Sequence, residues 1–367
     1  MAHKYDMAVF IGRFQPFHLG HRAVIEQGLE QADHVVVLVG SARSPRCHRN
    51  PFTFAERKEM IRGSFSGEIR ERVIVLPLED AAYNDAQWVL NVQKQVEQGA
   101  WYAGLSDLPA PIPAISPSVR VALIGHSKDA TSYYLKLFPQ WDNIEVPNFR
   151  DLNGTLIRST FFSNIGHMWV KDADGHRAGD LPRDATITGN VREFLEGFLD
   201  TPEYKLIRDE NEFIHKYRAS WASAPYAPTF VTVDAIVVQS GHVLLVRRGA
   251  NPGKGLWAMP GGFINADERI RNAVIRELRE ETGIKVPDAV LRGSIIEQDV
   301  FDDPNRSARG RTITHAFLIK LRDETALPKV KGMDDADKAR WVPISQLKPE
   351  DFFEDHYHII MNMVARI

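Results

Sequence analysis

The sequence has very little cysteine and no long apolar run. Cys47 is the single cysteine among 367 residues, which excludes an internal disulfide and a zinc cluster built from several thiolates. No stretch of about eighteen apolar residues occurs, and Met1–Phe10 lacks the apolar core of a signal peptide. We therefore expect a cytoplasmic protein that does not enter a membrane.

An excess of charge of one sign is also missing. The chain has 45 Lys and Arg against 48 Asp and Glu, so its formal net charge is −3. Proteins that hold a nucleic-acid backbone need a basic surface, and we therefore expect no nucleic-acid partner. With 44% hydrophobic and 25% charged residues the composition is typical of a globular protein, and the length favours two domains.

Acidic residues at regular spacing stand in the last third of the chain. Residues 262–284 read GFINADERIRNAVIRELREETGI. If Ala273–Thr282 is helical, Glu277, Glu280 and Glu281 lie at positions i, i+3 and i+4, so that three carboxylates share one face. Oxygen ligands suit hard divalent cations, which predicts Mg²⁺ or Mn²⁺ at this face. The alternative interpretation is a solvated acidic helix face.

The fixed positions of this stretch resemble the complete signature of the Nudix hydrolases. They are Gly262, Glu268, Arg276, Glu277, Leu278, Glu280, Glu281, Gly283 and Ile284. A pattern this long arises by chance on the order of once in a million chains or less. The resemblance implies a metal held by Glu277, Glu280 and Glu281, with Glu281 also taking part in catalysis. It implies supporting roles for Gly262, Glu268 and Arg276.

The signature leaves the general base of such a hydrolase open. Four acidic residues lie in the region from which the family can supply one: Glu297, Asp299, Asp302 and Asp303. The sequence does not favour any one of them.

The first half of the chain alternates between predicted strands and helices. Apolar runs at 7–11, 34–40, 73–78 and 119–124 are separated by helical patterns at 18–32, 54–65 and 88–98. This alternation predicts an α/β domain with a doubly wound, mostly parallel sheet. Ligands of such sheets bind beyond the carboxyl ends of the strands, so the loops after these strands are the candidate binding segments.

The loop after the first predicted strand reads Gly-Arg-Phe-Gln-Pro-Phe-His-Leu-Gly-His at 12–21. His18 and His21 are three residues apart at the start of a predicted helix, where backbone amides favour anions. Gly20 has no side chain to cover the backbone, and the planar guanidinium group of Arg13 can donate several hydrogen bonds to a polyphosphate. After a strand, this segment resembles the phosphate-binding signature of the nucleotidyltransferase superfamily. The resemblance implies that Gly12 and Phe14 also line the ATP site.

Three further segments resemble nicotinamide mononucleotide adenylyltransferases of the archaeal type. They are Gly40–Arg43 with Asn50–Arg57, then Gly125–Asp129, and then Asn153–Ser159. The resemblance implies ATP contacts from Gly125, Lys128, Asp129, Asn153 and Thr155, and a catalytic role for Arg158. Thr53 and Glu56 also form a capping box, which is a purely structural explanation of part of the first segment. The family more often has Ser where Asn153 stands, and both residues are good N-caps.

The segment Tyr83–Trp88 corresponds to the nicotinamide region of that family. The resemblance implies that Asn84 and Trp88 bind nicotinamide mononucleotide. An aromatic ring beside a cationic pyridinium is physically sensible, because the ring quadrupole attracts positive charge. The alternative is that Trp88 packs in the core from an amphipathic helix.

A second domain follows a proline-interrupted segment at 223–229. Predicted strands at 231–239, 242–247, 295–300, 312–321 and 340–343 surround the acidic helix. The Nudix resemblance implies an α/β/α domain with a mixed sheet. We predict a nucleotidyltransferase domain at 1–185, a helical connector and linker at 186–225, and a Nudix domain at 226–367.

The order of the two parts, adenylyltransferase first and Nudix second, matches a known bifunctional family. The resemblance implies AMP transfer from ATP to nicotinamide mononucleotide, giving NAD and pyrophosphate, and hydrolysis of ADP-ribose to AMP and ribose 5-phosphate. It implies Mg²⁺ or Mn²⁺ at both sites and leaves room for a homo-oligomer. Because one site makes a diphosphate and the other cleaves one, we expect the Nudix site to discriminate against NAD.

Two alternatives stay open on the sequence alone. A nucleotide sensor would bind its ligand without turnover, but such a sensor tolerates the loss of metal-binding glutamates, and all three are present here. A nucleotidyltransferase and Nudix pair could also act on other nucleotides. The segments 125–129 and 153–159 argue against that second alternative.

Overall fold

The computed structural model describes residues 3–105, 118–125, 136–147, 149, 152–163, 170–171, 177–178, 186–323, 326–331 and 336–367. The chain forms two compact units, Met1–Arg208 and Asp209–Ile367. The three-part domain division stays a prediction. No helix in the described ranges is long and apolar enough to cross a membrane.

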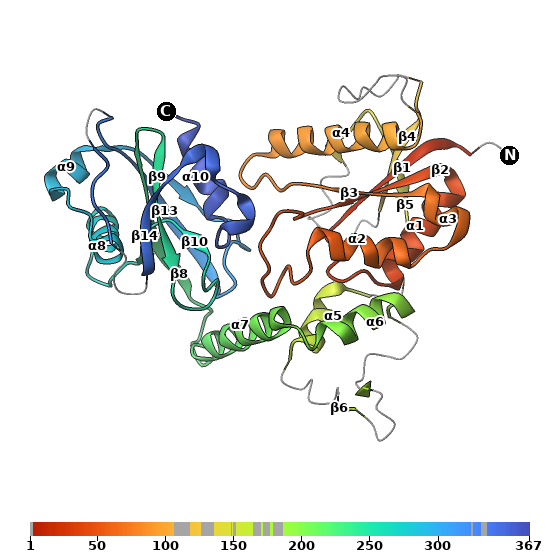
Figure 1. Ribbon diagram of the computed structural model, residues 1–367, viewed down its shortest axis with the longest axis horizontal. Coiled ribbons are helices and arrows are strands. Elements are labelled where there is room, and N and C mark those ends of the chain that lie inside the picture. Colours follow the sequence, from red (N-terminus) through yellow and green to blue (C-terminus); the bar gives the residue numbers. More distant parts are fainter. Residues whose placement is uncertain are drawn as a thin grey trace. The chain divides into compact units, whose positions relative to one another are not determined.

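The first unit is built on a parallel sheet, as predicted (Figure 1). Its described strands are β1 (Tyr5–Gly12), β2 (Ala32–Val39), β3 (Val73–Pro77), β4 (Val121–Gly125) and β5 (Asp142–Glu145), in the order β3-β2-β1-β4-β5. All four pairings between neighbouring strands are parallel. The prediction of a doubly wound α/β domain is confirmed.

Helices cover both faces of this sheet. They are α1 (Leu19–Gln31), α2 (Phe54–Gly63), α3 (Gly67–Arg72), α4 (Asp85–Tyr102), α5 (Gly154–Phe161) and α6 (Gly189–Phe198). Val35 and Val37 belong to one core cluster with residues of α1, α2 and α6, whereas Val36 and Leu38 belong to another with residues of α4. Successive residues of a strand point to opposite faces, so β2 alone contributes to two cores.

Two helix starts of this unit follow directly from local sequence. The Thr53 side chain accepts from the Glu56 N–H while the Glu56 carboxylate accepts from the Thr53 N–H, which confirms the capping box. The Asn153 side chain accepts from the Leu156 N–H at 2.8 Å, so Asn153 is the N-cap of α5. Both caps place a helix N-terminus near the candidate phosphate site.

The second unit contains a mixed sheet, as predicted. In its described part the strands are β8 (Thr229–Gln239), β9 (His242–Arg248), β10 (Trp257–Ala258), β11 (Gly261–Phe263), β12 (Ile295–Phe301), β13 (Arg311–Lys320) and β14 (Ala336–Pro343). The path runs β10-β9-β8-β13-β12, with β11 paired to β8 and β14 to β9. The β8–β13 pairing is parallel and the others are antiparallel.

Helices lie on opposite sides of this sheet (Figure 1). They are α8 (Ile270–Thr282), α9 (Asp288–Gly293) and α10 (His356–Val364), with short 3₁₀ helices η3 (Ile344–Gln346) and η4 (Pro349–Asp351) before α10. Val274, Ile275 and Leu278 of α8 are buried against the sheet. Helix α8 ends at Gly283, whose φ of 55° is left-handed, as expected for this position.

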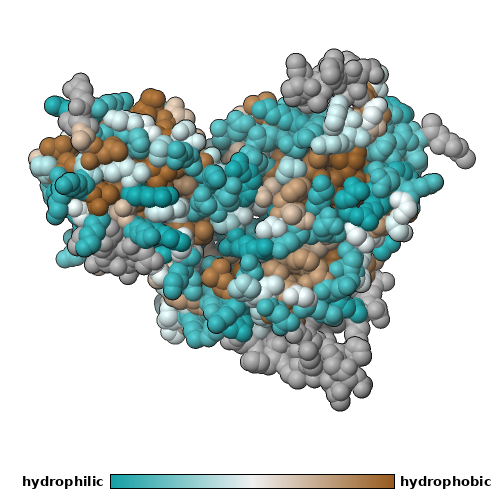
Figure 2. All heavy atoms as spheres, in the orientation of Figure 1, coloured by the Kyte–Doolittle hydropathy of each residue, from teal (hydrophilic) through white to brown (hydrophobic). Residues whose placement is uncertain are grey.

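Helix α7 (Pro202–Ala219) contains the boundary between the two units, and a small antiparallel pair, β6 (Val170–Lys171) and β7 (Arg177–Ala178), completes the described elements. On the face drawn in Figure 2, hydrophilic residues cover much of the described surface and hydrophobic residues occur in scattered groups. Scattered apolar side chains are normal for a folded surface. The large apolar side chains are concentrated in the cores.

Gly99 of α4 tests the close packing of this helix on β2. A Cβ atom at Gly99 would lie 2.8 Å from a Val36 methyl carbon, whereas a Cβ at Gly197 of α6 would meet nothing within 4 Å. We expect Gly99→Ala to lower the free energy of unfolding by about 1–3 kcal/mol through overpacking. Gly197→Ala should leave it unchanged or raise it by up to about 1 kcal/mol. Urea denaturation of both variants checks this, and equal effects would contradict it.

Candidate active sites

The first site lies where the strand order of the parallel sheet reverses. Strands β2 and β3 lie on one side of β1, and β4 and β5 lie on the other. Gly12 ends β1 and Gly125 ends the neighbouring β4, so both glycines mark the crevice at which such sheets bind ligands. Lys128 and Asp129, predicted to bind ATP, lie outside the described residues.

The imidazole rings of His18 and His21 cap the N-terminus of α1. Nδ1 of His18 accepts from the His21 N–H at 3.4 Å, and Nδ1 of His21 accepts from the His18 N–H at 3.3 Å. The two rings stack with centroids 3.6 Å apart. A neutral imidazole that accepts at Nδ1 carries its proton at Nε2, so Nε2 is the donor atom of each ring.

Phe14 and two glycines shape the loop around these rings. The Phe14 ring is buried, its backbone has a φ of 51°, and a Cβ at Gly12 would lie 2.9 Å from the ring. A Cβ at Gly20 would lie 3.1 Å from the His18 ring. The His21 ring packs against Phe14 and Phe17, with centroid distances of 4.8 and 5.7 Å. Gly12 and Gly20 are therefore explained by close packing within the loop.

Arg158 of α5 lies close to the same loop. Its Nη1 donates to the Gln15 carbonyl at 2.6 Å, and its Nη2 donates to Thr155 Oγ1 at 3.1 Å. Burial and the nearby Arg13 guanidinium lower the pKa of Arg158 to about 10. Two guanidinium groups near enough to repel each other create a place where an anion is favoured. The structure thus brings Arg13 and Arg158 together, as the predicted phosphate site requires.

Sequence reasoning missed the role of Arg57. This side chain is only 1% exposed, and its Nη1 donates to the carbonyls of Arg13 and Gly40, both at 2.7 Å, and its Nη2 to that of Ser41 at 3.0 Å. Arg57 therefore joins the ends of β1 and β2. Burial lowers the pKa of Arg57 to about 10, so it stays protonated at neutral pH. Its helical register with buried Met60 and Ile61 was the available sequence signal.

Asn84 and Trp88 have structural roles in α4. The Asn84 side chain caps the helix by accepting from the Gln87 N–H at 3.0 Å. Trp88 is partly buried against a core cluster, with its ring 6.1 Å from that of Phe138. The core-packing interpretation of Trp88 is thus supported, and nicotinamide mononucleotide binding by both residues stays a prediction.

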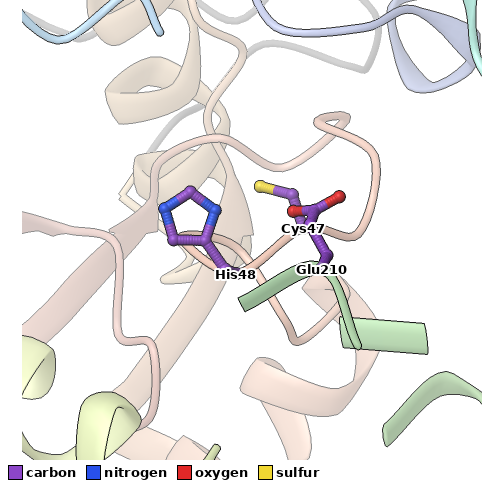
Figure 3. A group of neighbouring side chains, drawn as sticks. All are labelled: Cys47, His48 and Glu210. Carbon is purple, nitrogen blue, oxygen red and sulfur yellow. The ribbon is translucent and has the colours of Figure 1, made fainter. Parts of the chain in front are cut away.

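Figure 3 labels Cys47 and His48 in the loop between β2 and α2. Its third labelled residue, Glu210 of α7, belongs to the second unit, where it accepts from the Gly253 N–H at 3.1 Å. Cys47 and His48 alone supply two ligands, fewer than the three or four of a protein zinc site. We assign no metal to this pair.

The second site is a cavity of about 300 Å³ in the second unit. Carboxylates line one part of it, including Glu277 and Glu281 from α8, and arginines line another, including Arg248 and Arg309. Glycines of β11 complete the lining next to α8. The cavity therefore presents both signs of charge to a ligand.

Glu281 is held by the backbone of β11. Its carboxylate accepts from the Gly261 N–H at 2.9 Å. A Cβ at Gly261 would lie 2.2 Å from the Val233 carbonyl and 2.5 Å from an Asp234 oxygen, so a larger residue does not fit there. Burial raises the pKa of Glu281 to about 8, with Glu277 and Asp234 adding to the effect. A cation bound at this carboxylate would remove that electrostatic cost.

Arg276 pairs with the other glutamates of the motif. Its guanidinium bonds Glu268 at 2.8 Å, Glu277 at 2.7 Å and Glu280 at 2.8 Å. The hydrogen bond from Arg276 lowers the pKa of Glu268, whereas burial raises that of Glu277. Glu280 is 45% exposed and is not part of the cavity lining. The structure therefore brings Glu277 and Glu281 together in the cavity, with Glu280 beside them through Arg276.

Gly262 lies directly against Glu277. A Cβ at Gly262 would lie 2.7 Å from the Glu277 carboxylate. The two cavity carboxylates offer oxygen ligands, which suit a hard divalent cation. Burial raises the pKa values of both Glu277 and Glu281, and neighbouring carboxylates add to each effect, so the donor set fits such an ion.

The arginine-rich part of the cavity was not predicted from the sequence. The Arg248 guanidinium lies 4.0 Å from the Phe353 ring centroid, and that of Arg309 lies 5.1 Å from the Phe263 centroid. Arg306 forms a buried bidentate salt bridge with Asp355, with hydrogen bonds of 2.9 and 3.0 Å. Guanidinium groups beside a metal-binding face suit a diphosphate.

The four residues named as possible general bases lie elsewhere. Glu297 and Asp299 of β12 pair with Arg366 at 3.9 and 2.5 Å, and Asp302 pairs with Arg311 at 3.5 Å. The Asp303 carboxylate accepts from the Asn305 N–H at 2.7 Å. The cavity lining contains none of the four.

Two domain families match separate parts of the chain. The cytidylyltransferase-like family matches residues 9–105, and the NUDIX domain family matches residues 228–363. The matches fall on the parallel sheet and on the mixed sheet, respectively.

Individual relatives match either one part of the chain or nearly all of it. A crystal structure of a bifunctional NMN adenylyltransferase/ADP ribose pyrophosphatase from Francisella tularensis, complexed with AMP and a manganese ion, is 35% identical. It covers 99% of both chains with a TM-score of 0.83. A nicotinamide/nicotinic acid mononucleotide adenylyltransferase of Acinetobacter baylyi is 33% identical over 60% of this chain and 98% of its own length. An ADP-ribose pyrophosphatase of Methanocaldococcus jannaschii is 34% identical over 37% of this chain and 73% of its own.

Arg57 offers a test of how the first site is held. Arg57→Met leaves two buried carbonyls and one partly buried carbonyl without their donor, at about 1–3 kcal/mol for each unsatisfied buried group. We expect it to lower the free energy of unfolding by about 3 kcal/mol or more. Arg62→Met is the control on the same helix, because the Arg62–Glu71 pair is 3.8 Å long and its Glu71 side chain is 78% exposed, so the pair contributes about 0.5 kcal/mol or less. Chemical denaturation measures both, and a mild effect at Arg57 would contradict the assigned role.

Proposed function

Because the chain belongs to the family of bifunctional nicotinamide mononucleotide adenylyltransferase/ADP-ribose pyrophosphatases, we propose that it carries both activities. The first unit transfers AMP from ATP to nicotinamide mononucleotide, and the second hydrolyses ADP-ribose to AMP and ribose 5-phosphate. The observation that carries this proposal is the 35% identity over 99% of both chains, together with arginines at the first site and buried carboxylates in the cavity of the second.

Adenylyl transfer needs charge stabilisation more than covalent chemistry. A phosphate oxygen of nicotinamide mononucleotide attacks the α-phosphorus of ATP in line, the bond to the β-phosphate breaks, and pyrophosphate leaves. Nε2–H groups of His18 and His21 donate to the phosphates, and Arg13 and Arg158 neutralise the charge that moves to the leaving group. A bound Mg²⁺ or Mn²⁺ would supply further neutralisation.

The remaining residues of this site position the nucleotides. The ATP-binding group comprises Gly12, Phe14, Gly20, Gly125, Lys128, Asp129, Asn153 and Thr155. Asn84 and Trp88 form the nicotinamide mononucleotide group. Support comes from the loop packing of Gly12, Phe14 and Gly20 and from the cap that Asn153 places on α5. A helix N-terminus favours phosphate because its first amides lack partners within the helix.

Hydrolysis takes place in the cavity of the second unit. Glu277, Glu280 and Glu281 would hold Mg²⁺ or Mn²⁺, which would supply Lewis-acid chemistry at the diphosphate. Arg276, Glu268 and Gly262 keep these carboxylates in place. Arg248 and Arg309 neutralise the diphosphate from the other part of the cavity. Water attacks phosphorus, and the other phosphate leaves with its sugar.

Two substitutions separate the activities. His18→Ala should lower kcat for NAD synthesis by about 10²–10³-fold through the loss of one preorganised donor, and leave ADP-ribose hydrolysis unchanged. His18→Asn keeps an N-cap acceptor and should show the same loss, which distinguishes chemistry from helix capping.

Glu281→Gln should lower hydrolysis by at least about 100-fold, beyond the loss typical of outer-shell partners, and spare NAD synthesis. Assays of both reactions with Mg²⁺ check this, and joint loss in either variant would contradict two independent sites.

The hydrolase site should distinguish ADP-ribose from NAD. The nicotinamide ring is the feature that separates the two compounds, and one poor ring contact can contribute up to about 3 kcal/mol, or about 100-fold in kcat/KM. We expect a preference of this size for ADP-ribose. Assays of the full chain with Mg²⁺ and without pyrophosphate measure both substrates, and similar kcat/KM values would refute the expectation.

A further inference from the structure

The acidic motif of α8 supplies metal ligands but does not identify the group that takes a proton from the attacking water. Four carboxylates line the cavity of the second unit: Asp234, Glu277, Glu281 and Glu354. The general base is therefore sought among these four residues. The inference rests on the proposed hydrolytic function.

Three of these carboxylates have other partners. Asp234 is 5% exposed, one of its oxygens accepts from Thr314 Oγ1 at 2.5 Å, and the other lies against the backbone of Gly261. Glu277 and Glu281 are the proposed cation ligands, and they are already held by Arg276 and by the Gly261 N–H. Glu354 remains as the cavity carboxylate outside this arrangement.

Glu354 is fixed on the turn between η4 and α10. Its φ is 44°, a left-handed conformation that is uncommon for glutamate and costs on the order of 1 kcal/mol. The neighbouring residues hold the turn: the Phe353 N–H donates to the Trp257 carbonyl at 2.9 Å, and Asp355 is paired with buried Arg306. The turn therefore aims one particular side chain at the cavity at a cost in backbone energy.

The Glu354 carboxylate has room to accept a proton. It is partly buried, and one oxygen, Oε1, accepts from the Ala308 N–H at 3.0 Å. Within the described part of the chain this is the hydrogen bond that the carboxylate makes, so Oε2 is available, and Glu354 lines the cavity. A general base needs such an oxygen within hydrogen-bond reach of the attacking water.

The surroundings of Glu354 favour the uptake of a proton. Burial raises the pKa of Glu354, Asp355 adds to this, and Arg309 and Arg306 oppose it. His356 beside it stays neutral because burial lowers its pKa. The charges of both Glu354 and Glu281 act on Arg248 of β9, which lines the same cavity. Glu354 is therefore near the proposed cation ligands, and it is not one of the glutamates that pair with Arg276.

We propose that Glu354 is the general base of diphosphate hydrolysis. Its carboxylate takes one proton from water, the water oxygen bonds to phosphorus, and the bond from that phosphorus to the bridging oxygen breaks. The leaving phosphate departs with the electron pair of that bond. Attack at either phosphorus gives AMP and ribose 5-phosphate, so the products do not depend on which one reacts.

Glu354→Gln tests this role while keeping an acceptor for the Ala308 N–H. With saturating Mn²⁺ we expect kcat for ADP-ribose to fall by about 10²–10⁴-fold, with KM and Mn²⁺ affinity within about twofold of wild type. The remaining rate should rise about tenfold per pH unit, because hydroxide then replaces base-assisted water. Glu354→Gly suits the left-handed backbone and should show the same loss. Asp299→Asn is the matched control on β12 and should retain wild-type activity.

Three results would overturn the assignment. Retained kcat in Glu354→Gln or Glu354→Gly would show that no proton is transferred to this carboxylate. A parallel loss of Mn²⁺ affinity, measured by calorimetry, would make Glu354 a metal ligand instead. A residual rate with the wild-type pH profile would indicate a structural role alone. A wild-type chain without ADP-ribose hydrolysis would be a different failure, because it contradicts the proposed function itself.

Discussion

Burial of charged groups beside groups of the same sign is the constraint on which both candidate sites depend. In the second unit, burial and neighbouring carboxylates raise the pKa values of Glu277 and Glu281. In the first, burial and Arg13 lower the pKa of Arg158. Each arrangement is costly in the absence of a counter-charge, and each therefore requires a scaffold that holds the charged groups in place. In the proposed function, the counter-charge is a divalent cation at the second site and a polyphosphate at the first.

The scaffold meets this requirement through backbone hydrogen bonds. Arg57 donates to carbonyls at the ends of β1 and β2, which fixes the loop that carries the histidines. In the second unit the Gly261 N–H holds Glu281, and the pairing of β11 with β8 leaves space for glycine alone at that position. Backbone groups of a sheet move little, so they can hold charged side chains against their mutual repulsion.

Features encoded by short segments could be predicted from the sequence. The strand and helix alternation of the first unit, the mixed sheet, the Thr53–Glu56 capping box and the end of α8 at Gly283 all depend on residues near one another in the chain. The same holds for the motif that places Glu277 and Glu281 on one face of α8. For these elements the local pattern and the observed structure agree within a few residues.

Features that depend on contacts between distant segments could not be predicted. Strand β5 and helices α3 and α9 are short and have weak patterns, and α4 begins at Asp85 because Asn84 caps it. The arginine-rich part of the cavity combines β9 with the loop before β13, and Glu354 joins it from the turn before α10. No spacing rule connects these segments, and the predicted candidates on β12 were instead paired at the surface with Arg366.

The mutual capping of His18 and His21 has a consequence for the nucleophile of the first reaction. A neutral imidazole ring that accepts a backbone N–H at Nδ1 is a hydrogen-bond donor, and not an acceptor, at Nε2. Such a pair is poorly suited to activate a hydroxyl group. It is well suited to a phosphate that arrives already ionised, which is the nucleophile that the proposed reaction with a mononucleotide requires.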